Sequence, residues 1–230
     1  MPSTLPWEPA IYEHKAALIH ETPGAVARSE TLLRDAVMAE HAAYQADFIT
    51  LGIDIYNIEA EAIGARVVDT GPTGCPEIGR PLFDLDALPD ELPYPAFPDA
   101  GRCRLILGAG MLCKAALPAW VALRVGASGP ASIAAKLVGL QNLIMALASG
   151  EEDATRLLAY ALDISTRWTG ALRDAGLDVL VFDSVCAPPM MSPRMYEESV
   201  FPLHETLMRH LAVRGQTERA LIIGGDTTPI

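Results

Sequence analysis

The segment AGLDVLVFDS, residues 175–184, carries the clearest strand pattern in the chain. Gly176 is a typical helix-ending residue, and the apolar, β-branched run Asp178–Phe182 after it predicts a strand. A helical pattern at 151–175 precedes this strand, and a second one, opened by a Ser-Pro pair that suits the first helical turn, covers 193–214. A strand between two helices indicates an α/β protein with parallel strand pairing.

The same alternation extends to both sides of this segment. Further strands are predicted at 48–53, 120–125 and 220–223, with a two-residue strand at 67–68. Further helices are predicted at 11–20, 27–47, 100–116, 131–138 and 140–148. Nearly continuous apolar strands indicate a sheet buried on both faces. The Pro- and Gly-rich stretch 71–99 predicts an irregular surface excursion, and its length is typical of loops that cover a functional region.

Composition narrows the class of protein. The 230 residues are 50% hydrophobic, with a mean hydropathy of +0.23, which indicates one folded domain with a sizeable core. The formal net charge of -12 argues against a nucleic-acid binder, because phosphate contacts need a Lys/Arg surface. The sequence opens without a basic region followed by an apolar run, and no stretch reaches the ~18 apolar residues of a membrane span. We expect a cytoplasmic protein that contacts neither nucleic acid nor membrane.

Cysteine and histidine usage gives no recognised metal or redox pattern. The four cysteines form no Cys-x-x-Cys pair, so we expect reduced, mostly buried thiols. They are Cys75, Cys103, Cys113 and Cys186. The five histidines fall on predicted helices, away from strand ends, and we expect surface or packing roles for them. They are His14, His20, His41, His204 and His210.

Polar residues follow the carboxyl ends of four predicted strands, where parallel α/β proteins place their sites. Carboxylates that lie there are candidate catalytic groups, namely Asp54, Glu59, Asp183 and Asp226. Neighbouring polar side chains are candidates for substrate binding, namely Tyr56, Asn57, Glu61, Ser128, Ser184 and Thr227. If the strands are adjacent, these groups converge on one rim.

Each candidate carboxylate has a structural alternative. Asp54, Asp183 and Asp226 suit turns or caps, and the two glutamates at 59 and 61 suit a solvated helix start. The sequence contains no phosphate-binding loop, dinucleotide loop, nucleophile elbow or His-x-x-x-His pair.

Three segments together resemble one family. AGLDVLVFDSVCAPPMMSPRMYEESVFPLHETLMRHL (175–211) has a strand ending in Phe-Asp-Ser, a loop, Ser-Pro, then Tyr and a long helix. VGASGPASIAAKLVG (125–139) has a Gly-Pro turn and a helix, and ADFITLGIDIYNIEAEAIGARV (46–67) has a strand with a terminal Asp and a short helix. In order and spacing they resemble the uroporphyrinogen decarboxylase superfamily, over most of the chain from about residue 40. The resemblance implies a (β/α)8 TIM-barrel fold.

Within that family the chain looks closer to the corrinoid-dependent methyltransferases. The Arg-rich segment with which the decarboxylases grip substrate carboxylates does not precede Asp54, where only Lys15, Arg28 and Arg34 are available, and the chain is acidic. The resemblance therefore implies transfer of a methyl group between a small substrate, as donor or acceptor, and a corrinoid (methylcobamide or cobalamin) carried by a partner protein.

The zinc site typical of this branch is expected to be absent. The branch binds zinc through a His-x-Cys pair at a strand end and a later Cys, and it uses the metal to activate a thiol. The matching positions here hold Ile222 and Gly224. Any metal would need another set, such as Glu59, Glu61, Asp183 and Asp226, so the identity of a metal site stays unknown.

The chain is expected to form an incomplete barrel. Family members are longer, and we count about four or five barrel strands. We therefore divide the chain into an N-terminal helical segment, 1–47, and a partial (β/α) barrel domain, 48–230, which a second chain or copy would complete. Two other interpretations stay open. One is a decarboxylase acting on uroporphyrinogen or a related carboxylate, and the other is a non-catalytic fragment that binds a corrinoid or a partner.

Overall fold

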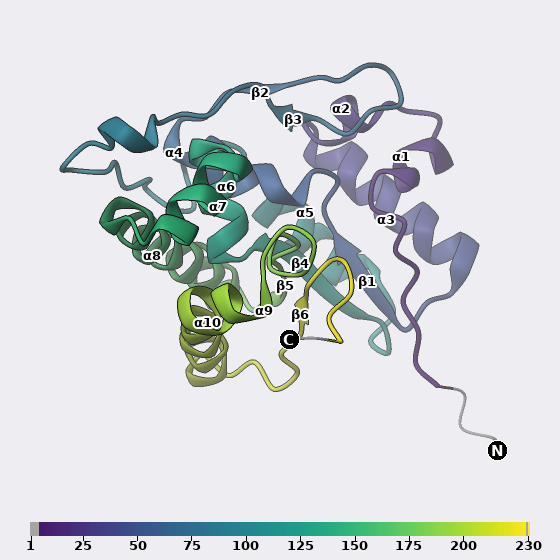
Figure 1. Cartoon of the computed structure of the whole chain (residues 1–230). Coiled ribbons are helices and arrows are strands. Elements are labelled where there is room, and N and C mark those ends of the chain that lie inside the picture. Colours follow the sequence, from purple (N-terminus) through teal and green to yellow (C-terminus); the bar gives the residue numbers. More distant parts are fainter. Residues whose placement is uncertain (1–4, 229) are drawn as a thin grey trace.

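The computed structural model describes residues 5–228 and 230, which fold into an α/β structure (Figure 1). The strands are β1 (Phe48–Leu51), β2 (Val67–Val68), β3 (Glu77–Ile78), β4 (Ala122–Ser128), β5 (Asp178–Phe182) and β6 (Leu221–Ile222). The helices are α1 (His14–Leu18), α2 (Pro23–Val26), α3 (Glu30–Tyr44), α4 (Ile58–Ile63), α5 (Cys103–Ala116), α6 (Pro130–Val138), α7 (Leu140–Ser149), α8 (Glu152–Asp174), α9 (Pro193–Met195) and α10 (Phe201–Val213).

Four strands form a parallel sheet in the order β1-β4-β5-β6. Leu51 is level with Val125, and Phe182 is level with both Ser128 and Ile222. The loops after these strands therefore meet at one edge of the sheet. The predicted α/β class with parallel pairing is confirmed. The short strands β2 and β3 form a separate antiparallel pair.

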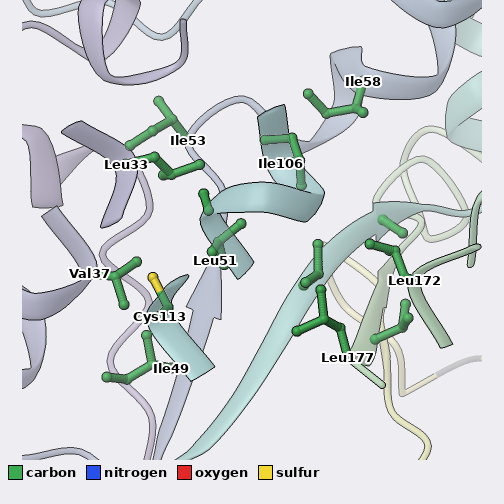
Figure 2. Packing of buried hydrophobic residues seen from close by; sticks show 14 of the residues in the cluster. Leu33, Val37, Ile49, Leu51, Ile53, Ile58, Ile106, Cys113, Leu172 and Leu177 are labelled. Atoms are coloured by element: carbon green, nitrogen blue, oxygen red, sulfur yellow. The ribbon is translucent and has the colours of Figure 1, made fainter. Parts of the chain in front are cut away.

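The main core lies between the sheet and its helices. Alternate strand residues, Ile49 and Leu51 of β1 and Val179 and Val181 of β5, share a buried cluster with side chains of α3, α5, α8 and α10. Figure 2 shows side chains of α3, β1 and α5 gathered in this core, among them Val37, Ile49 and Cys113.

The opposite face of the sheet is covered by chain segments outside the main helices. Leu180 and Phe182 form a small buried cluster there with Ile55. Tyr12 and Tyr56 each meet the Phe182 ring edge-on, at centroid distances of 5.5 and 6.1 Å. Both faces of β5 are thus buried, as the strand pattern predicted, although aromatic residues rather than a second layer of helices cover this side.

Several boundaries differ from the sequence prediction. The strand predicted at 120–125 covers Ala122–Ser128 and pairs with β5 up to Ser128. In its extension the Gly126 backbone lies against Ile55, where an added Cβ would come within 2.7 Å of that side chain. Helix 193–214 is interrupted by a π turn at Tyr196–Val200, and the following Pro202 has no N–H to donate to the preceding turn.

The excursion at 71–99 is less irregular than predicted. It contains β3 and a 3₁₀ turn at Leu85–Ala87. Both Leu82 and Phe83 donate backbone hydrogen bonds to the carbonyl of Leu137 in α6, at 2.8 and 3.0 Å. The middle of the segment is therefore fixed to α6, while much of the rest is exposed at the surface, as predicted.

The N-terminal helices belong to the same core as the sheet. Lys15 of α1 is 1% exposed, pairs with Glu40 of α3 at 2.7 Å, and donates to the Thr50 carbonyl of β1 at 2.6 Å. A buried pair of this kind is strongly destabilising when one partner is lost. The proposed division between 1–47 and 48–230 stays a prediction.

No single described helix is long and apolar enough to cross a membrane. The pair α6 and α7 passes that test of length and composition together, but it is bent by 110° at the break.

Candidate functional site

Asp54, at the end of β1, is held by an arginine that the sequence analysis missed. The Arg102 guanidinium donates to both carboxylate oxygens of Asp54, at 3.0 and 2.6 Å, and to Glu61 at 2.5 Å. Asn57 donates to Asp54 at 3.0 Å. Burial acts to lower the pKa of Arg102, but the hydrogen bonds and charges of Asp54 and Glu61 outweigh it and raise that pKa above its usual value, so the guanidinium stays charged. Arg102 lies 48 residues beyond Asp54 at the start of a predicted helix, and no local pattern marks it.

Glu59 is completely buried and bonded to the end of β4. Its carboxylate accepts from the Ser128 backbone N–H at 2.7 Å and from the Ser128 hydroxyl at 2.8 Å. Burial raises the pKa of Glu59 to about 7, although both Ser128 hydrogen bonds act in the opposite direction. The pair joins α4 to β4, and Glu59 lines none of the cavities described below.

Asp183, directly after β5, is also buried. Its carboxylate accepts from the backbone N–H groups of Ala131 and Ser132, at 3.1 and 2.6 Å, in the first turn of α6. His204 of α10 lies 2.8 Å from the same carboxylate through Nε2, and its Nδ1 lies 3.2 Å from the Tyr196 hydroxyl. Asp183 therefore joins β5, α6 and α10.

The expectation that all histidines lie away from strand ends is wrong for His204. Its side chain is 3% exposed and reaches the end of β5 from the first turn of α10. Sequence spacing could not show this, because the two residues are 21 positions apart on different elements. The cysteines agree with the prediction, since all four are free and three are buried.

One group of side chains has metal-binding donor types. Ligand atoms of Asp183, Cys186 and His204 lie within 4.8 Å of one another. Asp183 already accepts three hydrogen bonds, and burial followed by the nearby Asp183 charge raises the pKa of the Cys186 thiol far above its usual range. The three side chains form a buried hydrogen-bond network, and their donor types are also ones that bind zinc once the thiol is deprotonated.

The positions that the resemblance assigns to the usual zinc ligands carry no donor side chain. Ile222 lies on β6, and a Cβ added at Gly224 would meet Ser184 at 3.1 Å.

Two adjoining cavities open at the edge where β1, β4 and β5 end. One, of about 240 Å³, is lined by Asp54, Asn57, Cys75, Phe182 and their neighbours. The other, of about 310 Å³, is lined by Ser132, Ala135, Leu140, Ser184 and Val185. Tyr56 and Lys136 line both cavities. Tyr56 is hydrogen-bonded to Ser184, and burial, the largest cause, raises the pKa of its hydroxyl.

The last predicted strand end contributes differently. Asp226 is exposed and accepts from the Thr228 backbone at 3.0 Å, and the hydrogen bonds with Thr228 lower its pKa. Asp226 lines none of the cavities described here, and this geometry is the turn role that was its structural alternative. Thr227 lines a separate cavity of about 740 Å³ beside β6.

The structure thus gathers Asp54, Tyr56 and Ser184 around the two adjoining cavities, and it buries Glu59, Ser128 and Asp183 behind them.

Replacing Asp183 with Asn is expected to destabilise the fold by about 3 kcal/mol, because an amide group would face an N–H donor that now bonds to a carboxylate. Urea denaturation measures this loss. The control is Asp226→Asn, on an exposed carboxylate after the next strand, which should change stability by less than about 0.5 kcal/mol. Equal small effects in both variants would contradict the proposed joining role of Asp183.

Glu59 should make stability depend on pH. The pKa of Glu59 in the folded chain, about 7, lies above the ordinary glutamate value of 4.5, so between these two pH values the folded chain holds a proton that the unfolded chain releases. Its stabilising contribution is complete below pH 4.5 and is lost as pH rises to about 7. A difference of one pKa unit between the folded and unfolded chain is worth about 1.4 kcal/mol, so the loss of stability amounts to about 3 kcal/mol.

Urea denaturation between pH 5 and 8 tests this in the variant Glu59→Gln, which should lose the dependence. Glu61→Gln, in the same helix and paired with Arg102, should keep the wild-type slope. A wild-type slope in Glu59→Gln would rule Glu59 out as its source.

The fold can be compared with solved structures. A methyltransferase from Methanosarcina mazei aligns with a TM-score of 0.78 and 19% sequence identity. The alignment covers 94% of this chain and 63% of that protein, so this chain spans less than two thirds of its length. The comparison with curated proteins finds no match.

The resemblance drawn from three sequence segments is confirmed at the level of the family. The sequence model described as "Uroporphyrinogen decarboxylase (URO-D)" matches residues 10–230, which include every strand and helix described above. The chain therefore belongs to the uroporphyrinogen decarboxylase (URO-D) family.

Proposed function

We propose that this chain is the substrate-binding part of a URO-D-type methyltransferase, which moves a methyl group between a small substrate and a corrinoid carried by a partner protein. The observation that carries the proposal is the pair of adjoining cavities at the carboxyl edge of the sheet, where Tyr56 and Lys136 line both spaces. The edge is where parallel α/β proteins bind ligands, and the structurally similar methyltransferase supports the reaction class.

The roles of the polar residues follow from their contacts. The Tyr56 hydroxyl lines both cavities and is protonated at neutral pH, as tyrosines ordinarily are, so it can donate a hydrogen bond to a bound substrate. Asp54 lines the smaller cavity, but its carboxylate is paired with Arg102 and accepts a hydrogen bond from Asn57. Asp54 therefore forms part of the cavity wall and is not a free acid or base. Glu59 and Asp183 act as positioning residues, because they fix Ser128 and the first turn of α6.

The positions of the usual zinc ligands hold Ile222 and Gly224, which have no donor side chain, so thiol activation by a bound metal is not part of the proposal. The substrate is instead held and oriented by side chains, and this orientation is a large part of the catalysis of group transfer. Four free cysteines, three of them buried, agree with a reducing compartment such as the cytoplasm.

A decarboxylase acting on uroporphyrinogen is the less favoured candidate. A substrate with many carboxylates needs several free cations. Arg102 is already paired with Asp54 and Glu61, and among the residues described as lining the two cavities Lys136 is the one cation. The site therefore suits a substrate of low charge.

The proposed fold is part of a (β/α)8 barrel that a second polypeptide or a second copy completes. Within the described part of the chain β6 pairs with β5, and its outer edge has no strand beside it. The cavity of about 740 Å³ lies at this edge and is lined by apolar side chains that include Phe201 and Ile222, which are 44% and 39% exposed. Unpaired apolar edges of this kind favour association.

The methyl-transfer proposal predicts that the chain speeds the loss of methyl groups from methylcobalamin to a small thiol or amine, which absorbance follows directly. Tyr56→Phe should slow this reaction at least ~10-fold, because it removes one hydrogen-bond donor. Tyr94→Phe, on an exposed tyrosine that lines another cavity, should not. A spectral change on binding without methyl loss would indicate a non-catalytic corrinoid-binding chain, and no response at all would contradict both.

The barrel proposal predicts association in solution. Light scattering after size-exclusion chromatography should give a mass above 24.6 kDa. Ile222→Lys, which places a charge on the open edge, should lower that mass, whereas Val213→Lys, at a position that is 84% exposed, should not. A folded, monodisperse monomer of the unaltered chain would count against self-association and leave a separate second chain to be sought by co-purification.

A further inference from the structure

Lys136 is a cation without a described partner at the centre of the candidate site. It lies on α6, is partly buried, and lines both adjoining cavities. No residue that the structure describes forms an ion pair within 4.0 Å of its ammonium group or a hydrogen bond with it. The carboxylates of Glu13 and Glu77 line the smaller cavity with it, yet neither pairs with it. Its ammonium group is therefore available to pair with a bound anion.

Ser132 provides an independent second observation in the larger cavity. This residue lies four positions before Lys136, so both side chains are on one face of α6. It is 3% exposed, and its Oγ is buried without a hydrogen-bond partner among the described residues. Leaving a buried hydroxyl unsatisfied costs about 1–3 kcal/mol. Rotation of the Ser132 side chain toward the cavity would bring its Oγ to a bound acceptor and recover this cost.

The rest of the larger cavity defines the body of a ligand. Ala135, Leu140 and Val185 give it apolar walls, and the hydrogen-bonded pair of Tyr56 and Ser184 borders it. Its volume of about 310 Å³ is that of a small-molecule site. One cation, one unsatisfied hydroxyl and apolar walls together match one negative charge on an apolar body.

We infer that the larger cavity binds a small monoanionic carboxylate, with Lys136 and Ser132 on the carboxylate and the apolar walls around the rest of the molecule. The inference rests on the proposed function, since it names the substrate class of that same site. Asp183 holds the site in place, because its bonds to Ala131 and Ser132 fix the first turn of α6. Lys136 is thus a specificity-determining residue, and its role is to select a charged substrate.

Benzoate and benzamide test this as a matched pair, because they share a shape and differ in charge. Isothermal titration calorimetry of the full chain should show benzoate binding at least ~10-fold more tightly than benzamide. Lys136→Met should remove that preference, Lys136→Arg should keep most of it, and Ser132→Ala should weaken benzoate binding about 10-fold. Lys114→Met, on the exposed side of α5, should bind both probes as the unaltered chain does.

Several results would overturn the inference. They are equal binding of the two probes, no benzoate binding up to ~20 mM, tighter binding of inorganic phosphate than of benzoate, or unchanged benzoate binding in Lys136→Met. The comparison of benzoate with benzamide needs no variant, so it remains decisive if a substitution impairs folding. The titration needs neither corrinoid nor methyl donor, so failure of methyl transfer with selective benzoate binding would reject the proposed reaction alone.

Discussion

The carboxylate of Asp183 is the interaction on which the rest of the site depends. It holds the first turn of α6 through two backbone N–H groups and holds α10 through His204, while its own backbone follows β5. The contact is so close that a Cβ on Gly129 would lie 2.4 Å from this carboxylate, which explains a glycine at the turn between β4 and α6. Because α6 carries both Ser132 and Lys136, the position of the larger cavity follows from this one buried acid.

Burial separates the acidic residues of the site into two kinds. Glu59 and Asp183 are buried, and their carboxylate oxygens accept hydrogen bonds from backbone and hydroxyl donors. Their contribution is therefore to hold the structure together. Asp54 reaches a cavity wall, but Arg102 compensates its charge. In the larger cavity the polar groups left to meet a ligand are hydroxyls and one ammonium, so an acidic protein has one locally cationic cavity.

The fold was largely predictable from local patterns, because apolar runs between helical segments define a parallel sheet wherever they occur. The strand 178–182 and the helices at 151–175 and 100–116 lie within a few residues of their predicted limits. The part of the site built on strand ends, Asp54 and Ser184, was predictable for the same reason. Arg102 and His204 were not, because their partners are set by how helices pack across the sheet, which no spacing along the chain encodes. Asp226 shows the converse, since a strand-end position alone does not turn a side chain toward a cavity.

The π turn at Tyr196–Val200 fixes the length of the chain that connects β5 to α10. Each residue in an α-helix rotates the following side chains by about 100°, so the extra residue in this wide turn sets the phase of everything after it. Tyr196 precedes the shift and His204 follows it, yet the two side chains meet. A relative that keeps both the contact of Tyr196 with His204 and the bond of His204 to Asp183 must therefore also keep the number of residues between Tyr196 and His204. This fixed spacing can guide the alignment of distantly related sequences.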